Sequence, residues 1–254
     1  MVGFLFWEVS KINIKRPRKI NALHDINNFP KGFEERLAAQ ITYMHATRSP
    51  MKITGDDWED IFAKCIGGST PHQKVGLDDV VMGKSSWSAK TICSSKDFSK
   101  LDTVRLISGR NSISFSFSNS KGLTGSATKI GQQVLEIWNE RVRQTKEAYE
   151  STRIVVLVRN NDCSEFLVFE KELETYDPSK YIFRRNKNKN IEGFIKQGKK
   201  LIHKFTWQHS GSQFTIIDDI PKERLHFTVQ RPPKMEQDVI LKAVGFDKSW
   251  IKVL

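Results

Sequence analysis

The sequence has no apolar run that approaches the ~18 residues of a membrane-spanning helix. It has only three cysteines, which are scattered, so neither a CxxC metal site nor a disulfide framework is expected. Near the start, Glu8 interrupts a short apolar patch, and the basic cluster follows that patch, the reverse of the order in a signal peptide. These features argue against a membrane protein or a secreted one, and we expect a cytoplasmic, intracellular protein.

Positive charge is in excess, with 41 Lys and Arg against 29 Asp and Glu and a formal net charge of +12. One explanation is solubility. The other is a polyanionic partner, because clustered basic side chains release counterions when they neutralise phosphates. At 254 residues and 38% hydrophobic content the chain can form one large domain with a sizeable core. We favour nucleic acid as the partner.

Hydrophobic periodicity predicts a chain in which helices and strands alternate. The expected helices span 33–46, 54–68, 128–150 and 235–244; the expected strands span 75–83, 86–92, 103–118, 152–160 and 165–173, with shorter strands in 203–208, 212–220 and 224–232. Thr54 or Asp56 would cap the second helix, and Gly67 would stop it. From residue 54 the order is helix, three strands, helix and two strands, which predicts an α/β fold with a mixed sheet.

Two acids and a lysine stand on the first pair of expected strands, where charges are disfavoured. They are Asp78, Asp79 and Lys90. Carboxylates are the hard oxygen ligands that Mg²⁺ prefers. A lysine beside such a metal can orient or deprotonate a water and offset charge on a phosphorane. The pattern therefore indicates a metal site for phosphodiester cleavage.

This order of elements and the D…xxK spacing resemble the PD-(D/E)xK nuclease superfamily, the fold of most type II restriction endonucleases. That family's core is a helix, a three-stranded meander, a helix and a strand. Asp79 or Asp78 matches the motif's Asp, "SAK" at 88–90 matches (D/E)xK, and Glu59 matches the acid on the first core helix. The resemblance covers 54–173.

Ser88 departs from the family's pattern, since serine offers no anionic ligand. In some restriction enzymes of this superfamily a glutamate from elsewhere replaces the missing acid, and Glu59 and Glu136 are the candidates; a solvated helix position is the alternative for Glu136. The strand period of two puts Asp78 and Asp79 on opposite faces, and Asp79 is preferred because an apolar run follows it. The resemblance implies catalytic residues Asp79, Lys90, Asp78 and Glu59, and metal ligands Asp79, Glu59 and Glu136.

The resemblance implies a Mg²⁺-dependent, sequence-specific endonuclease that cuts double-stranded DNA in the bacterial cytoplasm. A homodimer is expected, because duplex sites are often palindromic, and a DNA methyltransferase would be the genetic partner. Two alternatives stay open. The first is a DNA-binding protein in which the nuclease fold has lost its site, and the second is a repair or RNA-processing nuclease on the same core.

Base recognition needs side chains that reach base edges, such as Arg for G and Asn or Gln for A. Two segments are rich in them, 184–190 and 208–213, and a solvated loop and a tight hairpin turn are their plain alternatives. The candidate DNA contacts are Arg110, Arg184, Arg185, Lys187, Gln208, His209, Ser212 and Gln213; the basic arm at 15–19 is another. We therefore divide the chain into an N-terminal arm and helix (1–50), a catalytic core (51–175) and a β-rich recognition part of the same domain (176–254).

Overall fold

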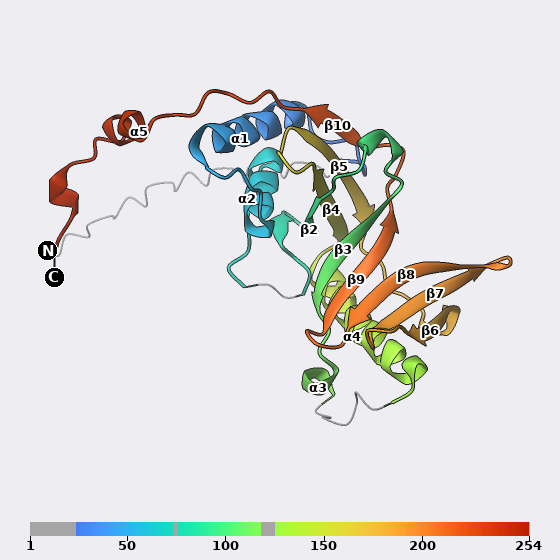
Figure 1. Ribbon diagram of the computed structural model, residues 1–254. Helices are drawn as coiled ribbons and strands as arrows, with labels where there is room; N and C mark the ends of the chain where they lie inside the picture. Colours follow the sequence, from blue (N-terminus) through green and yellow to red (C-terminus); the bar gives the residue numbers. More distant parts are fainter. Residues whose placement is uncertain (1–23, 74–75, 118–124, 254) are drawn as a thin grey trace, which may run out of the picture.

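The computed structural model describes residues 24–73, 76–117 and 125–253, so the basic arm at 15–19 lies outside the described residues. The fold is mixed α/β, with two five-stranded sheets (Figure 1). The helices are α1 (Phe33–Thr47), α2 (Gly55–Ile66), α3 (Ile113–Ser116), α4 (Ala127–Ala148) and α5 (Gln237–Ala243). The strands are β1 (Val80–Met82), β2 (Ser85–Cys93), β3 (Thr103–Arg110), β4 (Ser151–Arg159), β5 (Glu165–Glu172), β6 (Tyr181–Arg185), β7 (Ile191–Gln197), β8 (Lys200–Gln208), β9 (Gln213–Asp219) and β10 (Leu225–Thr228).

Helix α2 begins and ends where its sequence predicts. The Thr54 hydroxyl accepts a hydrogen bond from the backbone N–H of Asp57 at 3.2 Å, and the Asp57 carboxylate accepts one from the N–H of Thr54 at 2.9 Å. This capping box satisfies backbone donors that a helix start would otherwise leave unpaired. At the other end Gly67 adopts φ 76°, the left-handed conformation that glycine tolerates. The helix prediction for 54–68 is confirmed.

Sheet A has the strand order β1-β2-β4-β5-β10. β2 pairs in parallel with β4, and all other pairs in this sheet are antiparallel, so the sheet is mixed as predicted. Every residue of β4 between its two ends is buried, as expected of a strand covered on both faces. One face packs on α1 and α2, and the other packs on α4 and on sheet B.

Sheet B departs from the three-stranded meander that the resemblance implies. β3 pairs with β9 and belongs to an antiparallel sheet of order β3-β9-β8-β7-β6. It cannot extend sheet A beside β2, because β1 and β4 already occupy the two edges of β2. The chain therefore turns away after β2, buries Phe98 and Leu101, and enters the second sheet.

The predicted strand 103–118 is only half correct. β3 ends at Arg110 after an irregularity between Ile107 and Arg110, where Gly109 takes φ 96°. The alternating residues that follow form the single turn α3, because the Ser112 hydroxyl accepts a hydrogen bond from the N–H of Phe115 and caps a helix. Alternation of phenylalanine and serine predicts a strand with one buried face, but Phe115 and Phe117 are exposed.

Most other predicted elements are confirmed within one to three residues at their ends, among them α1, α4, β5, β8 and β9. Two predicted strands are shorter than expected: 75–83 contains only β1, and 224–232 contains only β10, which ends at Thr228. The polar and basic sequence around 178–200 predicts a loop, a hairpin boundary or a subdomain edge, and it contains the β6–β7 hairpin. None of the described helices is both long enough and apolar enough to cross a membrane.

Candidate active site

The β1–β2 hairpin brings the predicted aspartate and lysine together. Asp79 precedes β1, and its N–H donates to the carbonyl of Trp87 at 2.9 Å, which fixes the carboxylate beside β2. The Asp79 Oδ2 atom accepts hydrogen bonds from Lys90 Nζ at 3.0 Å, from the N–H of Ala89 at 3.0 Å and from the Ser88 hydroxyl at 3.2 Å. The side chains of Asp79 and Lys90 are 13% and 17% exposed, so the ion pair is largely shielded but still open to a ligand.

Strand alternation decides which face carries this cluster. Ser88 and Lys90 lie opposite Ile154 and Val156 of β4, whose side chains belong to the core that includes α4. Trp87 points to the other face and packs among residues of α1 and α2. The acid–lysine cluster is therefore on the α4 side of sheet A.

Asp78 has different partners from Asp79. Both acids precede β1, so the strand period of two does not apply to them, and each has a partner on α4 or at its C-cap. The Asp78 side chain is fully buried and accepts hydrogen bonds from the N–H of Gly76 at 2.9 Å and from the Tyr149 hydroxyl at 3.1 Å. Burial raises the pKa of Tyr149, and the charge and hydrogen bond of Asp78 raise it further. Asp78 thus ties the loop before β1 to the C-terminal end of α4.

Arg141 is a member of the cluster that the sequence analysis missed. Its guanidinium donates to the carbonyl of Ser108 at 3.1 Å, and it lies so close to Gly109 that a Cβ there would be 3.0 Å from Nη1. Burial lowers the pKa of Arg141, and the nearby negative charge of Asp79 opposes this change. Asp79 therefore has one cation on β2 and another on α4. In the sequence, Arg141 is one of several basic residues on a long helix, and nothing distinguishes it.

The two candidate replacement acids lie elsewhere. Glu59, on α2, lines a surface hollow with Asp56, Asp60 and Pro71. Glu136 is exposed on α4 and lines a groove of about 660 Å³ that also includes Arg141. Among the described residues, no three His, Cys, Asp or Glu side chains form a group that could hold a metal ion.

The oxygen atoms at the cluster can supply only part of the coordination shell of Mg²⁺. Mg²⁺ is often bound through one or two carboxylates, with substrate phosphates and water completing its octahedron. Asp79 supplies one carboxylate, and the Ser88 hydroxyl adds a neutral oxygen beside it. This set fits a metal that binds together with a phosphate more readily than a metal held by the protein alone.

The candidate DNA contacts gather at one end of sheet B. Gln208 and Gln213 form the last pair of the β8–β9 hairpin, and Gln213 also lies opposite Arg110 of β3. The N–H of His209, in the turn of that hairpin, donates to the Asn190 side chain at 3.4 Å, which links it to the neighbouring β6–β7 turn. Arg184 and Arg185 lie on β6, Lys187 lies in the β6–β7 turn, and Ser212 takes φ 52° in the β8–β9 turn.

A groove beside α4 joins Arg110, at this end of sheet B, to Arg141. Arg110 and Arg141 line the same groove, together with Phe115, Phe117 and Arg143. Phe115 is 87% exposed, so an aromatic surface accompanies the three arginines. The groove is thus bordered by Arg110, a predicted DNA contact, and by Arg141, whose charge acts on Asp79.

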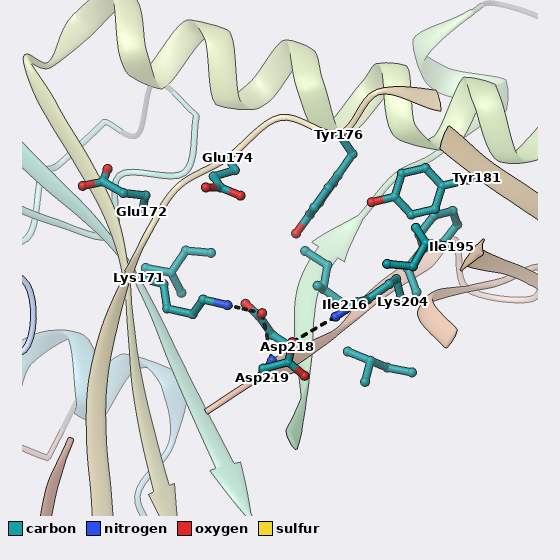
Figure 2. A pocket seen from close by; sticks show the side chains of 13 residues that line it. Lys171, Glu172, Glu174, Tyr176, Tyr181, Ile195, Lys204, Ile216, Asp218 and Asp219 are labelled. Carbon is teal, nitrogen blue, oxygen red and sulfur yellow. Dashed lines mark hydrogen bonds and ion pairs between the residues drawn. The ribbon is translucent and has the colours of Figure 1, made fainter. Parts of the chain in front are cut away.

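A second cleft lies at the junction of the two sheets and is separate from the cluster. Figure 2 shows its acids facing lysines: Lys171 is ion-paired with Asp218, and Lys204 is 3.1 Å from Asp219. Burial raises the pKa of Tyr181, at the cleft's wall, to about 12. These paired charges fit a structural joint between the sheets.

A buried charged network on the opposite face of sheet A was also missed. Glu170 is fully buried and accepts hydrogen bonds from Trp87 Nε1 at 2.6 Å and Arg153 Nη1 at 3.1 Å, with His24 Nε2 at 3.0 Å. The signal in the sequence was a glutamate inside the apolar run of β5. Its partners hold the segment around His24 and Asn27 against the sheet.

No family model matches this chain, and neither a curated protein nor a solved structure does. The inference of function therefore depends on the side-chain geometry and on the charge of the chain.

Proposed function

We propose that the protein is a Mg²⁺-dependent, sequence-specific endonuclease that hydrolyses phosphodiester bonds of double-stranded DNA. The observation that carries this proposal is the contact between Asp79, directly before β1, and Lys90 on β2, whose charged atoms are 3.0 Å apart. An aspartate and a lysine in this relation can serve a metal and a water at one phosphate. The net charge of +12 supports a polyanionic substrate.

Each residue of the cluster has a distinct role in the proposed reaction. Asp79 would hold Mg²⁺ together with a DNA phosphate, and the metal would polarise that phosphate and activate water. Lys90 would leave Asp79 for the phosphate, where it orients the attacking water and offsets the developing charge. Arg141, fixed by the carbonyl of Ser108, would keep a positive charge near Asp79 when Lys90 moves.

The substrate and partners follow from the same proposal. The end of sheet B with Arg110, Gln208 and Gln213 would read base edges, while the groove beside Arg141 would lead the strand to the cluster. A homodimer would place one active site on each strand of a palindromic site. A DNA methyltransferase gene beside this one would protect the host's own sites.

Incubation of the purified chain with unmethylated plasmid and Mg²⁺ tests the proposal. Discrete bands, lost on addition of EDTA, are the expected result, and run-off sequencing of the cut ends gives the site. Smearing or nicking at structured regions would instead indicate a repair or RNA-processing nuclease. The proposal is wrong if the chain retards DNA but never cuts it.

A DNA-binding protein without catalysis is the second candidate, and one observation favours it. Asp79 is the one carboxylate that accepts hydrogen bonds at the cluster among the described residues, and Lys90 already occupies one of its oxygens. A site that has lost its second acid could keep this ion pair as a structural contact. The plasmid experiment separates the two candidates.

Replacement of Ser88 by alanine should change cleavage less than about tenfold. The hydroxyl donates a single hydrogen bond to the Asp79 carboxylate, at 3.2 Å, and the N–H of Ala89 and the ammonium of Lys90 keep the carboxylate in place without it. Initial cleavage rates over a Mg²⁺ titration would measure the effect. A dead Ser88→Ala enzyme with unchanged thermal stability would mean that serine is itself a ligand or a proton carrier.

Replacement of Gln208 or Gln213 by alanine should weaken binding to the cognate site by about 1–3 kcal/mol, and weaken binding to random DNA much less. These side chains stand at the end of a hairpin, where an amide can reach an adenine edge. Competition binding without Mg²⁺ measures both affinities. Gln230→Ala, an exposed residue after β10, is the matched control. If affinity for cognate and random DNA falls equally, this hairpin contacts the DNA backbone and does not read bases.

A further inference from the structure

The hairpin of β7 and β8 extends beyond the rest of sheet B as a two-stranded ribbon (Figure 1). β6 pairs with β7 only as far as Ile195, and β9 pairs with β8 only from Phe205 onward. Beyond Ile195 the strands β7 and β8 pair only with each other, through Lys196 with Leu201 and Gln197 with Lys200. Residues 200–204 of β8 have no partner on β9. We call residues 196–204 the β7–β8 arm. Gly198 takes φ 60° at the tip, which allows the two-residue turn.

The β7–β8 arm carries positive charge without a compensating acid. Lys196, Lys199 and Lys200 are exposed at its tip. Between Glu192 and Asp218 the sequence has no acidic residue. In the part of the chain that the structure describes, none of the three lysines forms a salt bridge, whereas Lys204 at the arm's base is paired with Asp219.

A ladder of side chains stiffens the base of the arm. Phe194 of β7 stacks on His203 of β8 with 4.8 Å between ring centroids, and Arg184 of β6 lies over the Phe194 ring at 5.7 Å. His203 is held in turn by the Thr206 hydroxyl at 3.1 Å. A ribbon braced in this way can present its tip lysines at a fixed position, which lowers the entropy lost on binding.

We propose that the β7–β8 arm is a nucleic-acid contact that enters a groove of duplex DNA and places Lys196, Lys199 and Lys200 on its phosphates. The major groove admits a two-stranded ribbon of this kind, and phosphate contacts of lysine carry most of the non-specific affinity. The inference rests on the proposed function only in taking DNA as the polymer. It adds a second contact region, apart from the predicted recognition segments at the other end of the β8 strand.

Lysines on an exposed ribbon also have a simpler explanation, since charge on strand edges prevents edge-to-edge aggregation. The full-length triple variant K196Q/K199Q/K200Q separates the two. The probe is a fluorescent random-sequence duplex, and anisotropy is measured in Ca²⁺ between 50 and 300 mM salt. The matched control, K31Q/K52Q/K248Q, removes the same charge from exposed lysines on the α1 and C-terminal side.

The arm variant should bind at least about tenfold more weakly at 50 mM salt, with the slope of log affinity against log salt reduced by about 2–3, since each lost phosphate contact removes ~0.9. The control should change the slope by less than about 1. The charge-retaining variant K196R/K199R/K200R should bind as the wild type does. Circular dichroism and thermal melting confirm that all variants fold.

Equal losses in the arm variant and the control, or unchanged binding with increased aggregation of the arm variant, would overturn the inference. Cleavage assays on the same proteins keep it distinct from the proposed function. If the arm variant loses DNA binding and the wild-type protein never cuts DNA with Mg²⁺, the proposed nuclease activity is wrong and the role of the arm stands. If the arm variant binds and cuts DNA like the wild type, the proposed role of the arm is wrong and the proposed nuclease activity stands.

Discussion

Replacement of Lys90 by methionine is expected to reduce DNA cleavage by at least about 10²–10⁴-fold, the range for loss of a positioned acid–base group. Methionine keeps most of the apolar stem but removes the ammonium, which in the free protein is shared between Asp79 and the carbonyl of Ala89. Binding of DNA in Ca²⁺ should stay within a few-fold of wild type, because one lost charge is a small part of the total. Single-turnover cleavage and anisotropy measure the two effects.

Lys84→Met is the matched control for this substitution. Lys84 lies in the turn of the same hairpin, and its ammonium is exposed and paired with Glu150. It should cut at the wild-type rate. Near-normal cutting by Lys90→Met would remove Lys90 from the mechanism, and loss of DNA binding would make it a substrate-binding residue only.

Replacement of Asp79 by asparagine is expected to abolish cleavage at any practical Mg²⁺ concentration. The amide oxygen can still accept the hydrogen bond from the N–H of Ala89, so the hairpin should stay folded, but the anionic ligand is gone. Cleavage between 0.1 and 50 mM Mg²⁺, with thermal melting of the same samples, gives both quantities.

Asp78→Asn, next to it in the sequence, should have the opposite profile. Its fully buried carboxylate holds Gly76 and Tyr149, so its loss should lower the melting temperature while leaving cleavage by the folded fraction. A mutant that replaces a buried charged hydrogen-bond acceptor loses about 1–3 kcal/mol. If Asp78→Asn is inactive and stable while Asp79→Asn cuts, Asp78 and not Asp79 is the metal ligand.

Local patterns in the sequence predicted most of the elements, because helix caps, apolar periodicity and glycine stops act over a few residues. The β1–β2 hairpin could be predicted for the same reason. The position of β3 could not. It depends on β4, whose pairing with β2 joins residues that are far apart in the sequence and fills the edge β3 would have used.

The site was predictable where it depends on neighbours in sequence, and not where it depends on packing. Asp79 and Lys90 are brought together by one short hairpin. Arg141 joins them only because α4 packs across the sheet beside Ser108. Glu170 is similar, since its partner His24 comes from the far end of the chain. Whether Glu59 or Glu136 supplies a second carboxylate stays a prediction.

The two halves of the chain exchange strands between the two sheets, so neither half forms a complete sheet by itself. β3 lies in the first half of the chain but pairs with β9 of the second, and β10 returns from the second half to complete sheet A beside β5. Division near residue 175 would leave the edges of both β3 and β5 unpaired, and such edges invite aggregation. The halves should therefore melt as one cooperative unit. The segment that is proposed to read DNA is thus no transferable cassette, and new specificities would have to arise by substitution within its turns.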